Sequence, residues 1–190
     1  MLFILPDAKR KIPGGIPNVQ ETKPIHHDTD CSLLLPAIER FSGVVYKALD
    51  YASLPQTSKT YIAQHVAIMT GGFGLVKANQ LIGTYGIEIS KTHKMFKTGI
   101  KDQFVVDLLP QAHKKALYYH DGIRVEFIIQ KGTKKMPAGH QGKWIKGRFM
   151  RFCAVQNVQN VQEMLAFSED GYQAQQVNKH LITYTKQIAS

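Results

Sequence analysis

Short apolar runs rich in β-branched and aromatic residues recur along this chain and predict strands. The first run, Leu2 to Leu5, is stopped by Pro6 and is typical of a buried strand that leads into a polar loop. The other segments predicted as strands are 84–89, 103–109, 123–130 and 180–185.

Helical periods separate these runs. Residues 58–69 place apolar side chains on one helical face after Ser58, a suitable capping residue, and 75–82, 111–119 and 143–156 show similar periods. Two short helices are expected between 32 and 49, because Pro36 and Gly43 interrupt that segment. Interleaved strands and helices predict a mixed α/β (α+β) fold, a single domain over 1–190 with a central mixed sheet flanked by helices.

Two segments depart from these periods. Residues 11–30 carry several prolines and glycines and few large apolar residues, so an irregular loop is expected there. The stretch "MTGGFGLVKA", Met69 to Ala78, has three glycines in four positions between two predicted helices. This is the form of a helix-hairpin-helix element, which we predict over about 58–82.

The glycine stretch suggests phosphate binding for a physical reason. Glycines tolerate positive φ and lack Cβ, so successive N–H groups can point at a phosphate, and the next helix presents its positive N-terminal end. Lys77 could add a cation. The alternative is a tight interhelical turn that needs positive φ and binds nothing. A nucleotide-binding loop is disfavoured, because GKS or GKT is absent and a helix is predicted before the glycines.

Composition adds a candidate partner. The 190 residues carry 24 Lys plus Arg against 14 Asp plus Glu, a formal net charge of +10, which favours an anionic partner such as nucleic acid. The basic residues cluster in segments without acids at 9–11, 91–101 and 131–151. Solvated lysine faces are the alternative reading. The DNA-binding residues predicted from the hairpin and from the basic face of the helix at 143–156 are Gly71, Gly72, Gly74, Lys77, Lys143, Lys146, Arg148 and Arg151.

Aromatic side chains interleave with these basic residues. Trp144 and Phe149 could stack on bases, but both are interpreted as core residues because they adjoin the apolar helix face. Cys31 and Cys153 form no CxxC pair and favour a reducing compartment. We expect a cytoplasmic protein without a membrane partner, because no apolar run approaches the roughly 20 residues of a membrane-spanning helix.

Catalytic and metal-binding candidates are few. "HHDTDC", 26–31, contains His, Asp and Cys, but it lacks a recognisable ligand spacing and is interpreted as a polar loop. We therefore predict no metal and no cofactor. Burial could lower the pKa of a lysine enough for Schiff-base chemistry, and Lys9, which follows the first strand, is the weak candidate for such a nucleophile.

Several motifs, in order, resemble the YaaA family of peroxide-stress proteins. They are "PDAK" after the first strand, "FSGVVYKAL", "MTGGFGLVKANQLIGTYGIEI", "KGRFMRF" and "FSEDGY". They parallel the family's "SPAK", "FxGDVYxGL", "LSGLYGxLRPLD", "ARGxMxR" and "FxxxGY". Val44 stands where the family has an acid and Lys146 where it has an arginine, and the chain looks like a divergent, shortened member.

The resemblance implies a DNA-binding protein with a helix-hairpin-helix element and a basic cleft. Such a protein limits oxidative DNA damage during hydrogen-peroxide stress, and lower free intracellular iron is associated with that protection. DNA would be held through its backbone, because phosphate contacts carry no base information. Two alternatives are a DNA-repair lyase or glycosylase-like enzyme that uses a lysine, and an iron-handling protein. An enzyme is the less favoured reading.

Overall fold

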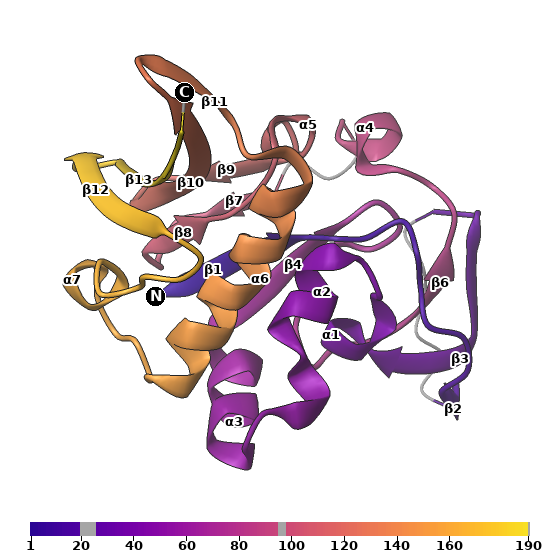
Figure 1. The fold of residues 1–190 in the computed structure, drawn as a ribbon. Helices are drawn as coiled ribbons and strands as arrows, with labels where there is room; N and C mark the ends of the chain where they lie inside the picture. Colours follow the sequence, from indigo (N-terminus) through magenta and orange to yellow (C-terminus); the bar gives the residue numbers. More distant parts are fainter. Residues whose placement is uncertain (20–25, 95–97, 190) are drawn as a thin grey trace.

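The fold is described from a computed structural model, over residues 1–19, 26–94 and 98–189. Its centre is a mixed sheet in the order β12-β13-β10-β8-β1-β4-β5, with β11 paired to β10 (Figure 1). Strands β13, β10, β8, β1 and β4 are parallel, and β12, β5 and β11 are antiparallel to their neighbours. The strands are β1 Leu2–Pro6, β4 Val66–Thr70, β5 Gly74–Lys77, β8 Val105–Asp107, β10 Gly122–Lys131, β11 Lys134–Pro137, β12 Tyr172–Asn178 and β13 Leu181–Ile188.

Both faces of β1 and β4 are covered, which explains their nearly continuous apolar runs. Every residue of β4 is buried, and so are four of the five residues of β1. Because side chains alternate along a strand, Phe3 and Leu5 enter one hydrophobic cluster and Ile4 enters another on the opposite face.

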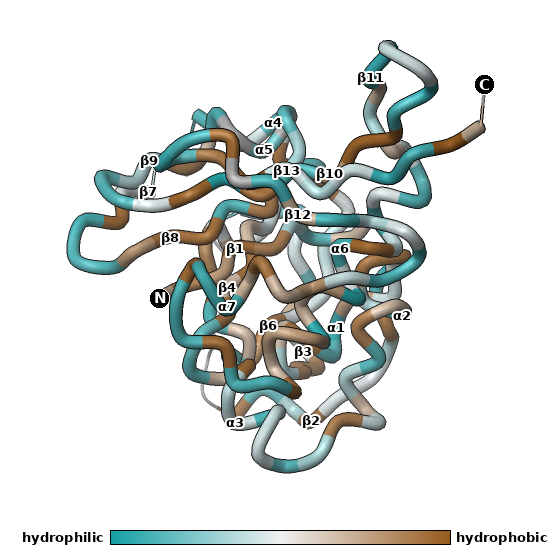
Figure 2. Tube along the Cα trace, turned by 60° about the vertical axis from the view of Figure 1, so that its left-hand side comes forward, coloured by the Kyte–Doolittle hydropathy of each residue, from teal (hydrophilic) through white to brown (hydrophobic). Residues whose placement is uncertain are grey.

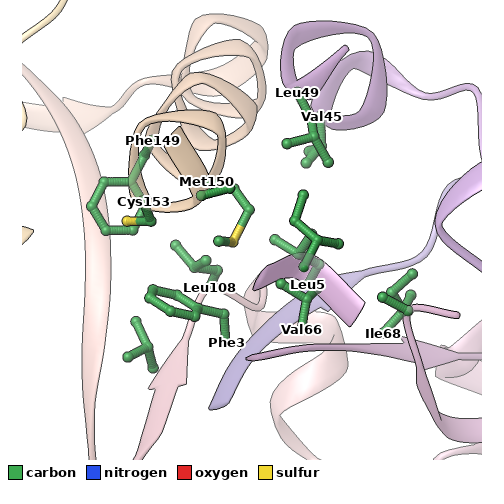
Figure 3. Close-up of a cluster of buried hydrophobic side chains, with 14 of the residues drawn as sticks. Phe3, Leu5, Val45, Leu49, Val66, Ile68, Leu108, Phe149, Met150 and Cys153 are labelled. Carbon is green, nitrogen blue, oxygen red and sulfur yellow. The ribbon is translucent and has the colours of Figure 1, made fainter. Parts of the chain in front are cut away.

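Helices α2 (Val44–Leu49), α3 (Gln56–His65) and α6 (Gly139–Val155) cover the first face. Phe149, Met150 and Cys153 of α6 are fully buried above Phe3 and Leu108 (Figure 3). Helix α6 approaches α2 closely at Gly147, where an added Cβ would lie 2.1 Å from the carbonyl oxygen of Val45. A glycine is required at this crossing.

The second face is covered by short elements: α4 (Ile89–Thr92), α5 (Gln111–Lys114), β7 (Thr98–Ile100) and β9 (Leu117–Tyr119). Ile89, Leu109 and Ala116 pack there against Ile4, Ala67 and Met69 of the central sheet. Figure 2 shows hydrophobic residues along β1 and hydrophilic residues at the projecting turn beside β11. The other short helices are the 3-10 helix Tyr51–Ser53 and α7 (Val161–Met164).

A second, three-stranded sheet in the order β2-β3-β6 packs beside α1 (Ala37–Arg40). Its strands are β2 Ile16–Pro17, β3 Thr29–Pro36 and β6 Leu81–Tyr85. Arg40 is fully buried at its centre and donates hydrogen bonds to four backbone carbonyls, those of Ile12, Gly14, Leu33 and Ile82. This arginine therefore ties the 12–14 loop to the small sheet.

The predicted mixed α/β class with a central mixed sheet is confirmed, and so are the strands within 2–6, 105–107, 122–131 and 181–188 and the helix covering 143–155. The two short helices expected between 32 and 49 are present as α1 and α2, although 32–36 belong to β3. Two element predictions are wrong, because 111–119 form α5 and β9 and 84–89 hold only the end of β6. In the predicted irregular loop, residues 16–17 form β2, and residues 20–25 lie outside the described part.

The predicted helix-hairpin-helix element is also wrong. Helix α3 ends at His65, β4 and β5 form a β-hairpin around the glycines, and β6 replaces the second predicted helix. The apolar run at 66–69 fits both a helical and a strand pattern, and pairing with the buried β1 decides for the strand.

Candidate functional site

Asp7 directly follows β1 and lies where the parallel strands end. In the central sheet β1 is flanked by β4, the next strand of this sheet along the chain, and on its other side by β8, which comes later in the sequence. In open α/β sheets, ligands bind outside the carboxyl ends of the strands, where the direction of strand succession reverses. This carboxyl edge is therefore the candidate functional region.

The Asp7 carboxylate is held by three groups. Its Oδ2 accepts hydrogen bonds from the Tyr85 hydroxyl at 2.7 Å and from the Gly71 N–H at 3.1 Å, and its Oδ1 lies 3.1 Å from His113 Nε2. Burial alone would raise the pKa of Asp7, but the bonds from His113, Tyr85 and Gly71 outweigh it and lower that pKa. Asp7 is therefore an ionised, preorganised carboxylate.

A cavity of about 200 Å³ opens beside Asp7 and His113. Lys9, Lys11 and Glu88 also line it. The Lys11 ammonium lies 3.8 Å from the centre of the Tyr85 ring, and burial lowers its pKa although Asp7 and Glu88 oppose that shift. The cavity thus combines an acid–base pair with cations.

A second cavity, of about 410 Å³, lies beyond α5 and is lined by Gln111, Arg124, Glu126, Lys143 and Lys146. The ammonium of Lys146 donates a hydrogen bond to the carbonyl oxygen of Leu108, just after β8. Burial lowers the pKa of Lys146 to about 8, against the opposing attraction of Asp107. Lys146 is therefore held partly as a neutral amine near physiological pH.

Arg124 neutralises the acids around this amine. Its Nη1 lies 2.8 Å from Asp107 Oδ2, and its Nε lies 2.6 Å from Glu126 Oε1. The other oxygen of Asp107 accepts a hydrogen bond from the Leu109 N–H at 2.8 Å. Asp107 is thus already satisfied without an ammonium partner.

The glycines predicted to bind phosphate lie buried at the turn between β4 and β5, and not between two helices. Gly71, Gly72 and Gly74 are buried, and the Gly71 N–H is already bonded to Asp7. A Cβ on Gly72 would lie 2.6 Å from the Tyr85 ring. These glycines allow the turn to pack tightly against 85–89, so their buried backbone does not offer the exposed N–H groups that a phosphate site needs.

Lys77 is exposed but lies away from that turn. Strand β5 runs antiparallel to β4, so Gly74 pairs with Thr70 at the carboxyl edge, whereas Lys77 pairs with Ala67 three residues further back. At about 3.3 Å per residue this separates the lysine from the glycines by roughly 10 Å.

The four predicted basic residues of α6 have three different environments. Lys143 is exposed, and Lys146 is bonded to Leu108. Arg148 Nε lies 2.5 Å from Glu169 Oε1, and Arg151 donates hydrogen bonds to the carbonyls of Leu49 and Asp50, both at 2.9 Å. The expected continuous basic face is therefore reduced to Lys143.

Trp144 and Phe149 were both predicted to be core residues, and only one of these predictions is confirmed. Phe149 is fully buried, as predicted, whereas Trp144 is 45% exposed and is not a core residue. Helix α6 turns Trp144 away from the sheet, because the buried face is set by Ile145, Phe149 and Cys153. Trp144 remains available at the surface beside Lys143.

Lys9 lies exposed at the mouth of the Asp7 cavity. Asp7 and His113 were not selected from the sequence. Asp7 could have been found from the sequence, because it is an acidic residue directly after a predicted buried strand. His113 could not, because nothing in the sequence indicates that it lies beside Asp7, 106 positions earlier.

The "HHDTDC" segment gives one compact group. Ligand atoms of His26, His27 and Asp28 lie within 4.8 Å of one another, at the surface. Cys31 lies in β3, and burial raises the pKa of its thiol. Among the described helices, none is long and apolar enough to cross a membrane.

Comparisons with known proteins agree with the order of motifs. The family described as peroxide stress protein YaaA matches residues 15–178. A UPF0246 protein of Finegoldia magna is 23% identical over 188 residues, covering 90% of this chain and 77% of that protein. UPF0246 proteins of Lactobacillus johnsonii and Corynebacterium glutamicum are 25% and 29% identical, over 74% and 64% of this chain. The chain spans 64% and 55% of the length of these two relatives.

Proposed function

This chain belongs to the peroxide stress protein YaaA family, which supports a role in peroxide stress, and we propose that it acts there by binding DNA through the phosphate backbone. The binding surface is the carboxyl edge of the central sheet. Three exposed lysines surround its two cavities: Lys9 and Lys143 line them, and Lys91 follows Ser90, another lining residue. We call these three residues the basic rim.

The gathering of three exposed lysines around two cavities at one edge of the sheet carries this proposal, since other exposed lysines such as Lys77 and Lys179 line neither cavity. Among the described residues, no member of the basic rim has an ion-pair partner, whereas Arg124, Arg148 and Arg151 are all paired to acids within the protein. Positive charge that is not neutralised internally attracts anions, and each phosphate contact releases counterions. Contacts of this kind hold DNA without reading its sequence.

Salt-dependent binding to a mixed-sequence duplex tests the proposal. Fluorescence anisotropy at several salt concentrations should give a steep negative slope of log K against log salt. The Lys91→Gln/Lys143→Gln variant should reduce that slope by about two, since each lost phosphate contact removes about 0.9. A flat slope for the unchanged protein rules out backbone binding.

The matched control is Lys77→Gln/Lys179→Gln, which removes the same charge from the opposite edge of the central sheet. Lys77 ends the antiparallel β5 and Lys179 precedes the parallel β13, and both are exposed. This control should bind like the parent. Equal losses in the two double variants would show that net charge, and not the basic rim, drives binding.

Glu88 provides a gain-of-binding test. It is exposed and lines the Asp7 cavity beside Lys9, so its carboxylate repels phosphates at the rim. Glu88→Gln should tighten duplex binding several-fold at low salt and should have a smaller effect at high salt. Unchanged affinity at low salt would place the DNA away from this cavity.

A second candidate function, iron binding, rests on the surface group of His26, His27 and Asp28. Two imidazoles and one carboxylate form a donor set that suits Fe(II). Anaerobic titration with Fe(II) should show one site that His26→Ala/His27→Ala removes and that His120→Ala/His140→Ala retains. No heat of binding in the unchanged protein would exclude this function.

A further inference from the structure

The Lys146 amine lies at a position where it can react with a small electrophile. It comes from α6, between the buried residues Ile145 and Gly147, so the helix fixes its stem in the core. Its nitrogen reaches the carboxyl end of β8 and lines the 410 Å³ cavity. The amine is therefore preorganised in a cavity and is not carried on a mobile surface side chain.

The groups around Lys146 favour the neutral form of its amine, which is the nucleophilic form. Arg124 occupies Asp107 and Glu126, so neither acid forms an ion pair with Lys146, and Lys143 adds a nearby positive charge. A neutral amine can donate one N–H to the Leu108 carbonyl and still present its lone pair. Burial and neighbouring cations are the usual means by which proteins activate lysines for attack on carbonyls.

We propose that Lys146 forms an imine with an aldehyde, and that its substrate is the ring-opened deoxyribose of an abasic site in DNA. The proposal rests on the proposed function for the source of the aldehyde. Phosphates that flank such a sugar match Lys143 at the same cavity, whereas Leu109, Pro110 and Phe127 offer apolar walls. An abasic sugar lacks a base, so a cavity of this size can accept it.

The step balances in atoms and electrons. The Lys146 lone pair forms a C–N bond to the aldehyde carbon, and the C=O π pair moves to oxygen, which takes a proton. The resulting carbinolamine loses water and leaves a C=N bond, so one aldehyde and one amine give one imine and one water. Addition of water reverses the step. No oxidant or reductant is needed.

Reductive trapping tests the inference. Sodium cyanoborohydride is added to the full-length protein with a duplex that carries one abasic site, and the reduced adduct is mapped by peptide mass spectrometry. We expect a single protein–DNA adduct at Lys146, and its formation rate should rise with pH and level off above about 8. A duplex with a tetrahydrofuran abasic analogue, which has no aldehyde, should give none.

Two lysine variants separate the nucleophile from general charge. Lys146→Arg keeps the positive charge and a donor for Leu108 but has no reactive amine, so trapping should fall at least tenfold. Lys77→Arg, at the opposite edge of the central sheet, lies outside the proposed binding surface and should trap normally. An adduct that persists in Lys146→Arg, or that maps to Lys9 or Lys143 in the unchanged protein, overturns the proposal even if a variant folds poorly.

A small aldehyde distinguishes the two possible failures. If 2-deoxyribose 5-phosphate is trapped at Lys146 but the duplex is neither bound nor trapped, the imine chemistry holds, and both DNA as the source and the proposed function fail. If the duplex binds with a steep salt slope and neither aldehyde is trapped at Lys146, the imine proposal alone fails.

Discussion

Two regions use basic residues in opposite ways. In the small β2-β3-β6 sheet, Arg40 is fully buried and all of its described hydrogen bonds go to backbone carbonyls. At the carboxyl edge of the central sheet, Lys9, Lys91 and Lys143 are exposed and have no ion-pair partner among the described residues. A planar guanidinium satisfies several carbonyls at once, whereas an ammonium is more strongly hydrated and stays in water. The same formal charge therefore stabilises one region and remains available for ligands in the other.

The largest expected effect on stability comes from replacing the buried arginine, Arg40. Arg40→Met leaves four carbonyls without their donor, and we expect the free energy of unfolding to fall by about 3 kcal/mol or more. Chemical denaturation measures the loss. Arg10→Met, which changes an exposed arginine, should cost less than about 0.5 kcal/mol. Similar losses in both variants would contradict a special role for Arg40.

The second-largest loss of stability is expected from a substitution in the glycine turn between β4 and β5. In Gly71→Ala the new Cβ would lie 2.4 Å from the carbonyl oxygen of Ile87, so we expect a loss of about 2 kcal/mol from overpacking. Gly86→Ala is the matched control, because nothing lies within 4 Å of its added Cβ. Thermal unfolding should separate the two variants. Equal melting temperatures would mean that the turn tolerates side chains and is less closely packed.

Asp7 links the turn to the cavity beside the rim. Because its folded pKa is lowered, the ionised carboxylate stabilises the fold above its unfolded pKa of about 3.9, and this contribution is lost as pH falls through the lower folded value. Asp7→Asn should therefore lower the free energy of unfolding by about 1 to 2 kcal/mol at pH 7 and by progressively less below pH 4. Denaturant melts from pH 7 to pH 2 measure this difference. Asp102→Asn, at an exposed position, should follow the parent throughout.

The smallest effect on stability is expected at the rim itself. Lys91→Gln should change the free energy of unfolding by less than about 0.5 kcal/mol, because Lys91 has no ion-pair partner within the described part of the chain. It should nevertheless reduce the salt slope of duplex binding by about one. Lys179→Gln should change neither quantity. A large stability loss in Lys91→Gln would show that this lysine, like Arg40, has a structural role.

The sequence predicted much of the central sheet and its longest helix. The continuous apolar run at 2–5 indicates a buried segment, the run at 123–130 begins by alternating apolar and charged residues, and the β-branched residues in 123–130 favour a strand. The period at 143–156 recurs over enough residues to define α6 and its buried face. The ordered motifs were sufficient to indicate the family, which the family match over 15–178 confirms.

The glycine stretch and the basic residues depended on the tertiary structure. A run such as 66–69 fits a helix or a strand locally, and pairing with β1 decided for the hairpin that buries Gly71 and Gly72. Likewise, spacing puts Lys143 and Lys146 on one helical face, but only the approach of β8 and β10 places Lys146 against a carbonyl while Lys143 stays in water. Hydrophobic periodicity is a local property that the sequence carries by itself. The environment of a charge is set by residues far away in the chain, so only the packed fold decided which cations stabilise this protein and which remain free to bind.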